Sequence, residues 1–415
     1  MPRPRIAVIS FPGTNGDTEN LRALQRCGIE AFVFLWNEDR EKLQDIDGYF
    51  FGAGFSYEDR GRSGMIAARD PLMQFMVEEA ACGKAVIGNC NGAQILVESG
   101  LIPLDSGLRM SLARNAIRTE NSWSSPGFLN EWVWITPTCK RDRCATADWS
   151  GAMHIPIAHG EGRFTTKDRD VIGELRRNDQ LAFSYCDASR TISTDPIVTP
   201  NGSEYAIAGI CNPAGNVVAL MPHPERTPNG DPYVHSLRRW IETHPWSRKA
   251  PAKVPSSYGE ISIPIRERSG TEIFIDTIIV NNEERTVEQA LRRLVPSVKL
   301  KQLRYARLRD REVRDVLTHV SFFNPHKEVA YVRRGTSVTR WNSEAKSEES
   351  SDDFFAKSIA FLRRDESEMP SALLGEGGQT GICYVCSGTN EDEFRRSELQ
   401  EIFANPHASI LERFA

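Results

Sequence analysis

One short turn, Gly88-Asn89-Cys90-Asn91-Gly92, constrains the fold of this chain more than any other feature. An apolar run, Lys84–Gly88, leads directly into it, and a segment with helical periodicity, Ala93–Ser99, follows it. In a Gly-x-nucleophile-x-Gly turn, a strand bends so sharply into a helix that the flanking positions accept only minimal side chains. The sequence therefore predicts an α/β domain that carries this turn at the carboxyl end of a sheet strand.

The first hundred residues support this prediction, because apolar strand-like runs alternate with helical segments. That alternation is typical of a mostly parallel sheet covered by helices on both faces. The expected strands are Arg5–Phe11, Ala31–Leu35 and Gly48–Phe51, and the expected helices are Thr18–Cys27 and Pro71–Cys82. Shorter strand-like runs follow at Glu131–Ile135, Ile155–Ala158, Tyr205–Cys211 and Val217–Leu220, before a closing helix at Val234–Glu242.

Cys90 is the candidate nucleophile. The predicted turn lifts its sulfur out of the sheet and aims the amino end of the next helix at it, which favours the reactive thiolate. The alternative is a buried, inert cysteine, which is the usual state of a lone cysteine. Two glycines at these offsets, between a strand and a helix, favour the nucleophile.

A thiolate of this kind needs a base and a group that orients the base. Met221-Pro222-His223-Pro224-Glu225-Arg226 supplies both directly after the expected strand Val217–Leu220. His223 and Glu225 are two residues apart, so they project the same way from an extended segment, and Glu225 can accept a proton from the imidazole. A His-x-Glu pair alone is more often structural; its place after a late strand favours the catalytic interpretation.

The third expected component is an oxyanion hole. Gly52-Ala53-Gly54 follows the strand Gly48–Phe51 at the same edge of the sheet as Cys90. The Gly54 region and the Asn91 amide are candidates to donate hydrogen bonds to a tetrahedral intermediate. By itself, the glycine pair indicates only a turn.

The chain, at 415 residues, exceeds the roughly 250–300 residues that one hydrophobic core usually serves. Residues 247–257 are rich in Pro, Ala and Lys and cannot continue a helix or a central strand, so we expect a linker between domains at 1–246 and 258–415. The second domain should be α+β: strands at Glu272–Val280 and Lys299–Leu308, helices at Thr286–Leu294 and Arg311–Phe322, and a mobile acidic loop at Ser343–Asp353. Phe322-Phe323-Asn324-Pro325-His326 returns as Phe403-Ala404-Asn405-Pro406-His407, which suggests two repeats.

Composition limits the function classes. The net charge is −5 with no long basic run, so binding to nucleic acid or to a membrane surface has no electrostatic support. The first residues lack the features of a signal peptide, and no stretch approaches the roughly 18 apolar residues of a membrane span. Nine irregularly spaced cysteines suit a reducing compartment, which predicts a cytoplasmic protein. Cys383 and Cys386 point to opposite faces if they lie in a strand, so we expect no zinc or other metal site there.

These features together resemble the class I (triad) glutamine amidotransferases, in which a nucleophilic cysteine is followed late in the chain by His-x-Glu. Longer motifs resemble one subfamily more closely, the glutaminase subunits of phosphoribosylformylglycinamidine synthases, over about residues 4–245. They are Phe11–Asn15, Gly54–Tyr57, Cys90–Leu96, His159–Phe164, Asn201–Ser203, Ala208–Asn212 and Met221–Arg226. Three positions depart from that pattern: Ala53 and Glu58 stand where glycine is usual, and Asn89 stands where an apolar residue is usual.

The resemblance implies a role for each matching residue. Cys90 would attack the carboxamide of L-glutamine, His223 would move the proton, and Glu225 would orient His223. Gly54 and Asn91 would serve the oxyanion, and Gln94 would contact the substrate glutamine. The loop that holds His159, Glu161 and Arg163 would lie near the partner enzyme.

The resemblance also implies partners and products. The reaction would be hydrolysis of glutamine to glutamate and ammonia, for the ATP-dependent conversion of formylglycinamide ribonucleotide to formylglycinamidine ribonucleotide in purine biosynthesis. The ammonia would pass to a large synthetase subunit. The sequence has no phosphate-binding glycine-rich loop with a lysine, so we expect ATP and Mg²⁺ on that partner and no cofactor in this chain. The region 258–415 resembles the small accessory subunit of the same synthase. Two alternatives stay open: an amidotransferase or cysteine hydrolase with another substrate or acceptor, and a catalytically silent assembly protein.

Overall fold

The computed structural model of the chain describes residues 3–104, 107–120, 122–247, 260–266, 270–352, 355–356, 358–369 and 371–414. The chain divides into two compact units, Met1–Ser257 and Tyr258–Ala415, and each is described by itself. Apart from Ser247, the linker predicted at 247–257 lies outside the described residues. Within the described ranges, no helix is both long enough and apolar enough to cross a membrane.

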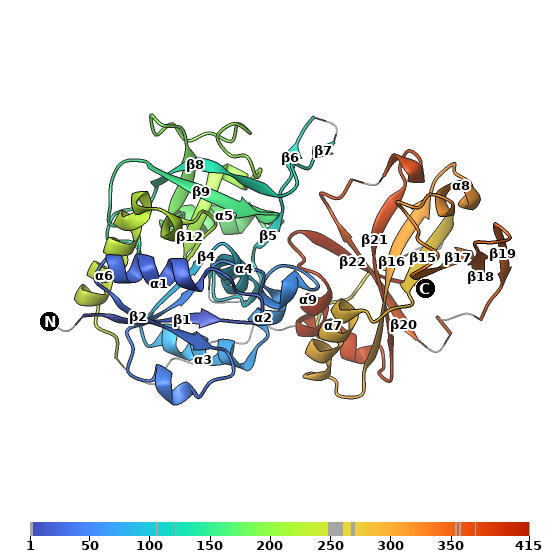
Figure 1. The fold of residues 1–415 in the computed structure, drawn as a ribbon, viewed down its shortest axis with the longest axis horizontal. Helices are drawn as coiled ribbons and strands as arrows, with labels where there is room; N and C mark the ends of the chain where they lie inside the picture. Colours follow the sequence, from blue (N-terminus) through green and yellow to red (C-terminus); the bar gives the residue numbers. More distant parts are fainter. Residues whose placement is uncertain are drawn as a thin grey trace. The chain divides into compact units, whose positions relative to one another are not determined.

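The first unit is built on one nine-stranded mixed sheet (Figure 1). The strands from β2 to β13 are parallel to their neighbours, and those from β13 to β9 are antiparallel. The α/β class predicted from the sequence is confirmed. In spatial order the strands are β2 (Glu30–Leu35), β1 (Arg5–Ser10), β3 (Gly48–Phe51), β4 (Ala85–Asn89), β13 (Val217–Leu220), β12 (Ile207–Cys211), β11 (Phe183–Cys186), β8 (Leu129–Pro137) and β9 (Met153–His159).

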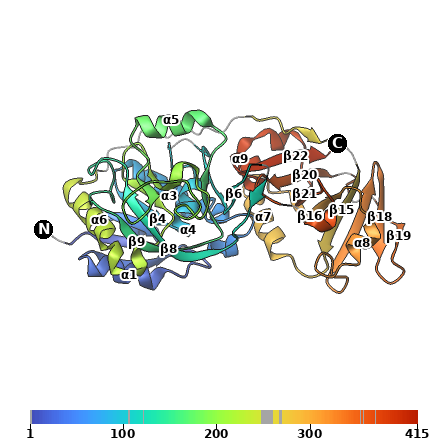
Figure 2. The ribbon, with the colours of Figure 1, turned by 90° about the horizontal axis from the view of Figure 1, so that it is seen from above.

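Helices cover both faces of this sheet because the central strands are apolar on both faces. In β1, Ile6 and Val8 join the core beneath α1 (Asp17–Arg26) and α6 (Asp231–Thr243). Ala7 and Ile9 join the opposite core, beneath α3 (Pro71–Ala81), α4 (Asn91–Glu98) and α5 (Arg169–Arg177). Figure 2 shows α1 and α5 on opposite sides of the sheet.

The expected elements around the turn agree with the structure to within about one residue at most ends, whereas several smaller elements escaped prediction. These are α2 (Met65–Ala68), α5, β11, the pair β5 (Ser111–Arg114) and β10 (Glu161–Thr165), and the pair β6 (Ile117–Arg118) and β7 (Trp123–Ser124). Most are two to five residues long, which is too short for a periodic pattern to stand out. In α5, three buried apolar side chains stand at helical spacing among charged ones, so this helix has a signal in the sequence.

The second unit is also a nine-stranded sheet, antiparallel at every pairing except that of β14 with β22. In spatial order its strands are β14 (Ile265–Arg266), β22 (Ser409–Phe414), β20 (Ile359–Asp365), β21 (Gln379–Ser387), β16 (Lys299–Leu308), β15 (Thr271–Thr277), β17 (Glu328–Arg334), β18 (Ser337–Asn342) and β19 (Ser347–Ser350). The helices are α7 (Asn282–Arg292), α8 (Val313–Leu317) and α9 (Ser397–Phe403). This is the α+β architecture expected for the second domain.

Two segments of the second unit differ from the prediction in type or extent, and the bounds of β15 and α7 differ by two to four residues at some ends. The acidic stretch Ser343–Asp353, predicted as a mobile loop, contains β19, which pairs with β18 as a hairpin. Glu348 holds this hairpin together, because its carboxylate accepts hydrogen bonds from the Thr339 hydroxyl at 2.6 Å and from Arg334 at 2.6 Å. The helix predicted at Arg311–Phe322 is confined to α8, which spans Val313–Leu317.

The repeated Asn-Pro-His segments have the same local structure. The side-chain oxygen of Asn324 accepts from the His326 N–H at 3.1 Å, and that of Asn405 accepts from the His407 N–H at 3.0 Å. The sheet order is also symmetric about the pair β16–β21: β15 and β17 follow on one side, β20 and β22 on the other, each with antiparallel pairing. A short helix precedes the corresponding strand in each half, α8 before β17 and α9 before β22.

A buried ion pair crosses the second sheet. Arg333 and Glu272 are paired across β17 and β15, and the Arg333 Nε donates to Glu272 Oε2 at 2.8 Å. The hydroxyl of Tyr305 donates to Glu272 Oε1 at 2.7 Å. All three side chains are buried, and the Arg333 guanidinium also lies 4.5 Å from the centre of the Phe414 ring.

Replacing Arg333 with Met should lower the free energy of unfolding of the second unit by about 3 kcal/mol, because the buried Glu272 then loses the cation that bonds its Oε2 and keeps only Arg266, 3.5 Å from Oε1. Arg334→Met is the matched control. Its ion pair with Glu348 is partly exposed and should contribute less than about 1 kcal/mol. Differential scanning calorimetry of the full chain measures both. Equal losses for the two variants would contradict the importance of burial.

Candidate active site

The three candidate segments follow three adjacent parallel strands. The spatial order β3-β4-β13 places the carboxyl ends of these strands side by side. Gly52–Gly54 follows β3, Cys90 follows β4, and His223 follows β13. Loops at the carboxyl edge of such a sheet are where open α/β folds build their sites, so the topology brings these distant segments together.

Cys90 occupies a strained turn. Its φ is 51° and its ψ is −109°, a conformation that is costly for a residue with a side chain. Its backbone N–H donates to the Leu220 carbonyl at 2.8 Å, and its thiol donates to the Ala158 carbonyl at 3.6 Å. A Cβ on Gly92 would lie 2.0 Å from the Phe51 carbonyl oxygen, and one on Gly88 would lie 2.5 Å from that of Gly92. The nucleophile turn predicted from the sequence therefore needs both glycines.

His223 and Glu225 form a buried pair beside Cys90. The distance from His223 Nδ1 to Glu225 Oε1 is 2.6 Å, and both side chains are almost fully buried. The backbone N–H of His223 donates to the Pro156 carbonyl at 2.9 Å, and this bond sets the direction of the segment after β13. Within the described part of the chain, His223 Nε2 makes no hydrogen bond of ordinary geometry, so this nitrogen is the one that can serve the thiol.

The electrostatics favour a charged imidazole in this pair. Burial opposes a charge on His223, but Cys90 and Glu225 outweigh it and raise the pKa of His223 to about 10. Burial would raise the pKa of Glu225, but the imidazole and a hydrogen bond from Asn89 lower it instead. A thiolate–imidazolium pair stabilised by a carboxylate is the arrangement used in nucleophilic catalysis by cysteine.

The loop after β3 is held against the loop after β1. Gly54 forms an isolated β-bridge with Thr14, and a Cβ on Gly54 would lie 2.7 Å from the Thr14 Cα. Ala53, one of the departures from the family pattern, is accommodated because Gly16 faces it.

Of the backbone amides after Cys90, that of Gly92 already donates to the Gly52 carbonyl. The Asn91 N–H lies in the first turn of α4, where amides lack an intrahelical acceptor. It therefore stays the candidate oxyanion donor.

Asn91 and Gln94 have structural bonds that the sequence did not reveal. The side-chain oxygen of Asn91 accepts from the Ser56 N–H at 3.0 Å, and its amide nitrogen donates to Gln94 Oε1 at 2.9 Å. The Gln94 amide nitrogen donates to the Glu161 carbonyl. Both side-chain groups of Gln94 are thus bonded to the protein, and its contact with substrate stays a prediction.

The three residues predicted to lie near the partner differ in burial, and their contact with a partner stays a prediction. His159 and Arg163 are 3% and 4% exposed, so both side chains are held inside the first unit. His159 Nδ1 lies 3.2 Å from Asn115 Oδ1, and Arg163 Nε donates to the Arg114 carbonyl at 3.1 Å. Burial and the nearby His223 lower the pKa of His159 to about 3, which keeps it neutral. Glu161 is half-buried, and its role stays a prediction.

Sequence reasoning missed three residues that shape this site. Asn115 bonds both ends of the turn after β9, donating to the His159 carbonyl at 2.7 Å and accepting from the Gly162 N–H at 3.1 Å. Asn89 donates to Glu225 Oε2 at 3.0 Å and accepts from the Tyr233 hydroxyl at 3.1 Å. The only signal in the sequence was the polar Asn89 next to the nucleophile; nothing marked Asn115 or Tyr233.

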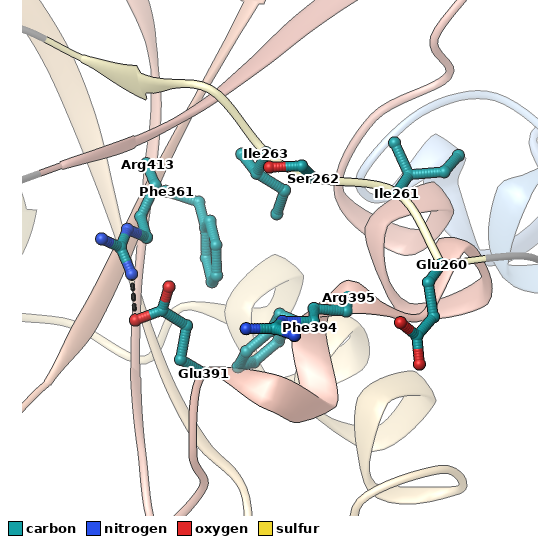
Figure 3. Close-up of a pocket in the computed structure, with 9 residues that line it drawn as sticks. All are labelled: Glu260, Ile261, Ser262, Ile263, Phe361, Glu391, Phe394, Arg395 and Arg413. Carbon is teal, nitrogen blue, oxygen red and sulfur yellow. Dashed lines mark ion pairs between the residues drawn. The ribbon is translucent and has the colours of Figure 1, made fainter.

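A separate cavity of about 400 Å³ lies in the second unit (Figure 3). The rings of Phe361 and Phe394, 4.7 Å apart, form its apolar wall, and Glu391 and Arg413 form an ion pair at its side. Its lining residues are Glu260, Ile261, Ser262, Ile263, Phe361, Glu391, Phe394, Arg395 and Arg413. This lining includes neither cysteine nor histidine, so we assign no reaction to it.

Sequence comparisons agree with the geometry of the first unit. The family described as "CobB/CobQ-like glutamine amidotransferase domain" matches residues 3–248. A phosphoribosylformylglycinamidine synthase subunit PurQ from Methanothrix thermoacetophila is 44% identical over 225 residues, which are 54% of this chain and 86% of that protein. The subunit of the same name from Thermomicrobium roseum is 39% identical over 224 residues, 54% of this chain and 87% of the relative.

A solved structure also matches. The chain is similar to one from the structure of PurLQS from Thermotoga maritima, with 27% sequence identity and a TM-score of 0.44, over 58% of this chain and 100% of that one.

A left-handed turn borders the candidate oxyanion loop. Tyr57, Glu58 and Asp59 have φ values of 52°, 58° and 54°, in the region that favours glycine. The exposed Glu58 carboxylate pairs with Arg60 at 2.9 Å. Burial and the neighbouring Glu161 raise the pKa of Asp59 to about 7. Glu58, which replaces the usual glycine, therefore carries a backbone cost next to the site.

Glu58→Gly should give a free energy of unfolding about 1 kcal/mol higher than Glu58→Ala, because only glycine adopts this conformation without steric cost. Both changes remove the ion pair with Arg60, so the comparison isolates the backbone. Urea denaturation of the two variants measures the difference. Equal stabilities would show that the turn is unstrained.

Proposed function

The chain belongs to the CobB/CobQ-like glutamine amidotransferase family, and on that premise we propose that it is the glutaminase component of a phosphoribosylformylglycinamidine synthase. It hydrolyses L-glutamine to glutamate and ammonia. The ammonia serves the ATP-dependent conversion of formylglycinamide ribonucleotide to formylglycinamidine ribonucleotide. The observation that carries the proposal is the buried His223–Glu225 pair beside a cysteine in a nucleophile turn.

The chemistry follows from the positions of three side chains. The Cys90 thiolate attacks the carboxamide carbon of glutamine, and the carbonyl oxygen gains a negative charge. The imidazolium of His223 gives its Nε2 proton to the leaving nitrogen, so ammonia departs and a γ-glutamyl thioester stays on Cys90. A water molecule, deprotonated by His223, then attacks the thioester and releases glutamate and the thiolate. Glu225 holds His223 by Nδ1 throughout and stabilises its charge.

The oxyanion is assigned to backbone amides near the turn. The Asn91 N–H and the Gly54 region flank the carbonyl position, and the Asn91 side chain fixes the distance between α4 and the loop after β3 through Ser56. Removing one such donor typically reduces the rate by roughly 100- to 1000-fold. Gln94 contributes to the oxyanion site indirectly, because its side chain is bonded to the Asn91 side chain and to the Glu161 carbonyl.

The partner proposed for this chain is the large synthetase subunit, which would bind ATP and Mg²⁺ and use the ammonia. The relatives' name, phosphoribosylformylglycinamidine synthase subunit, and the PurLQS title support the pairing of such subunits in one synthase. We propose a cytoplasmic location, consistent with nine cysteines that are all free thiols. His159, Glu161 and Arg163 stay the candidate partner contacts, and Glu161 is the least buried of the three.

The second unit is proposed to be an accessory module made of two repeats. The equal Asn-Pro-His turns and the symmetric strand order about β16–β21 support a duplicated unit that pairs with itself inside one chain. Isologous pairing of identical elements is the usual way to build a two-fold dimer. The module would link the glutaminase unit to the synthetase, as proposed for the small accessory subunit that this region resembles.

The nucleophile assignment is tested with the synthetase complex. Cys90→Ala should lower glutamine-dependent synthesis by at least about 1000-fold and leave ammonia-dependent synthesis largely intact, because only ammonia production is lost. His223→Ala should be nearly as damaging, and Glu225→Gln should be milder. Cys82→Ala, a cysteine at the end of α3, is the control. Loss of both activities in Cys90→Ala would contradict the assignment. Ammonia release that never reaches formylglycinamide ribonucleotide would indicate another acceptor.

The role of the second unit is tested by truncation. A chain ending at Ser247 should fold and keep its triad, because all triad residues and both cores of the first unit precede that point. It should lose stable binding to the synthetase. Gel filtration of the synthetase mixed with the truncated or the full-length chain measures this. Equal co-elution of the two would show that residues 258–415 are not the link.

A further inference from the structure

Asn89 connects the candidate triad to helix α6. It is the last residue of β4 and is fully buried, as is Tyr233 on α6. Its amide nitrogen donates to Glu225 Oε2 at 3.0 Å, and its carbonyl oxygen accepts from the Tyr233 hydroxyl at 3.1 Å. With the bond between Glu225 and His223, this makes three hydrogen bonds in series.

The direction of every bond in this series is fixed by chemistry. An ionised carboxylate can only accept hydrogen bonds, so the NH₂ group of Asn89 must face Glu225. The Asn89 carbonyl oxygen then faces Tyr233, whose hydroxyl must donate. Burial raises the pKa of Tyr233, so its hydroxyl keeps the proton that it donates.

We infer that Asn89 and Tyr233 are positioning residues for the nucleophile system: they hold the Glu225 carboxylate in the orientation that presents Oε1 to His223 Nδ1. The inference rests on the proposed glutaminase function and extends it to two residues outside the triad. Side chains of consecutive strand residues point to opposite faces. Asn89 therefore lies on the face of the sheet covered by α6, and it acts on the reaction only through Glu225.

A neutral donor suits this position. An arginine or lysine here would cancel the charge of Glu225 and weaken its hold on the imidazolium. An apolar residue, the usual residue before the nucleophile in the resembling family, would leave Oε2 without this donor. The Asn89 amide satisfies Oε2 and leaves the negative charge available to His223. The departure from the family pattern thus has a physical role in this chain.

Several other groups face the triad and bear on any pH effect. His159, at the end of β9, is neutral above about pH 3. Burial raises the pKa of Tyr185 on β11, and the nearby Cys90 raises it further, so Tyr185 keeps its proton. Tyr233 carries no charge over the working range. The groups whose charges change between the resting and reacting forms are therefore Cys90 and His223, while Glu225 stays ionised.

The test compares Asn89→Leu with a matched control, Asn216→Leu. Asn216 is also a buried asparagine of the first unit, but its amide nitrogen donates to the carbonyls of Ala80 and Lys84, away from the triad. In Asn89→Leu, the loss of a donor to the charged carboxylate makes Glu225 easier to protonate. The acid limb of the pH–rate profile for glutamine hydrolysis should then move up by about one pH unit, and kcat should fall about tenfold.

The expected pattern separates positioning from binding and from general destabilisation. KM for glutamine should change less than about twofold in Asn89→Leu, because Asn89 does not touch the substrate. Tyr233→Phe, which keeps the ring and removes only the hydroxyl, should lower kcat about threefold, and it tests the same series if Asn89→Leu fails to fold. The Asn216→Leu variant should be less stable than the wild type, but the acid limb of its pH–rate profile should stay where it is in the wild type. A wild-type kcat and acid limb in Asn89→Leu would overturn the inference while the proposed function stands.

A second measurement covers the case in which the proposed function itself is wrong. Alkylation of Cys90 by iodoacetamide, followed by mass spectrometry across pH, requires neither glutamine nor a partner. The pH at which the alkylation rate is half of its maximum should move up by about one pH unit in Asn89→Leu and should not move in Asn216→Leu. No glutamine hydrolysis by the wild-type complex, together with this shift, would reject the function and retain the inference. An unchanged midpoint would reject the inference.

Discussion

The parallel pairing of β3, β4 and β13 is the constraint on which the rest of the site depends. In this register Phe51 lies opposite Gly88, and Leu220 lies opposite Asn89, so the three strands end together. The backbone bond from Cys90 to Leu220 then fixes the turn of one strand on the end of the next. Residues separated by more than 100 positions in the sequence meet there because the strands are in register, with no need for a flexible loop to bring them together.

The strain and the charges at this edge are supported by packing around them. Cys90 keeps its unusual backbone only because Gly88 and Gly92 leave room for Phe51 and for each other. The His223–Glu225 pair is desolvated on both sides, and a buried pair of this kind is stable only when its remaining hydrogen-bonding groups are satisfied. The neutral amide of Asn89 meets that requirement for Glu225 Oε2, and it belongs to the same strand end as the nucleophile.

Much of the site could be predicted from the sequence because its signals are local. Two glycines at fixed offsets identified Cys90, and a His-x-Glu pair after a strand identified His223 and Glu225. What the sequence did not reveal is long-range packing. His159 and Arg163 lie in a glycine-rich segment that looked like a surface loop, yet Asn115 and Arg114, more than 40 residues earlier, draw both side chains inward. No periodicity in a single sequence carries that information.

The central claim is that Cys90 is a nucleophile for the glutamine carboxamide, activated by His223 and held by Glu225. The most direct measurement is covalent labelling with a diazoketone analogue of glutamine, followed by mass spectrometry of the intact chain and of its peptides. The account predicts one adduct per chain, on Cys90, formed much more slowly in His223→Ala and blocked by excess L-glutamine. An adduct on any of the other eight cysteines, or labelling of Cys90 at the same rate without His223, would contradict it.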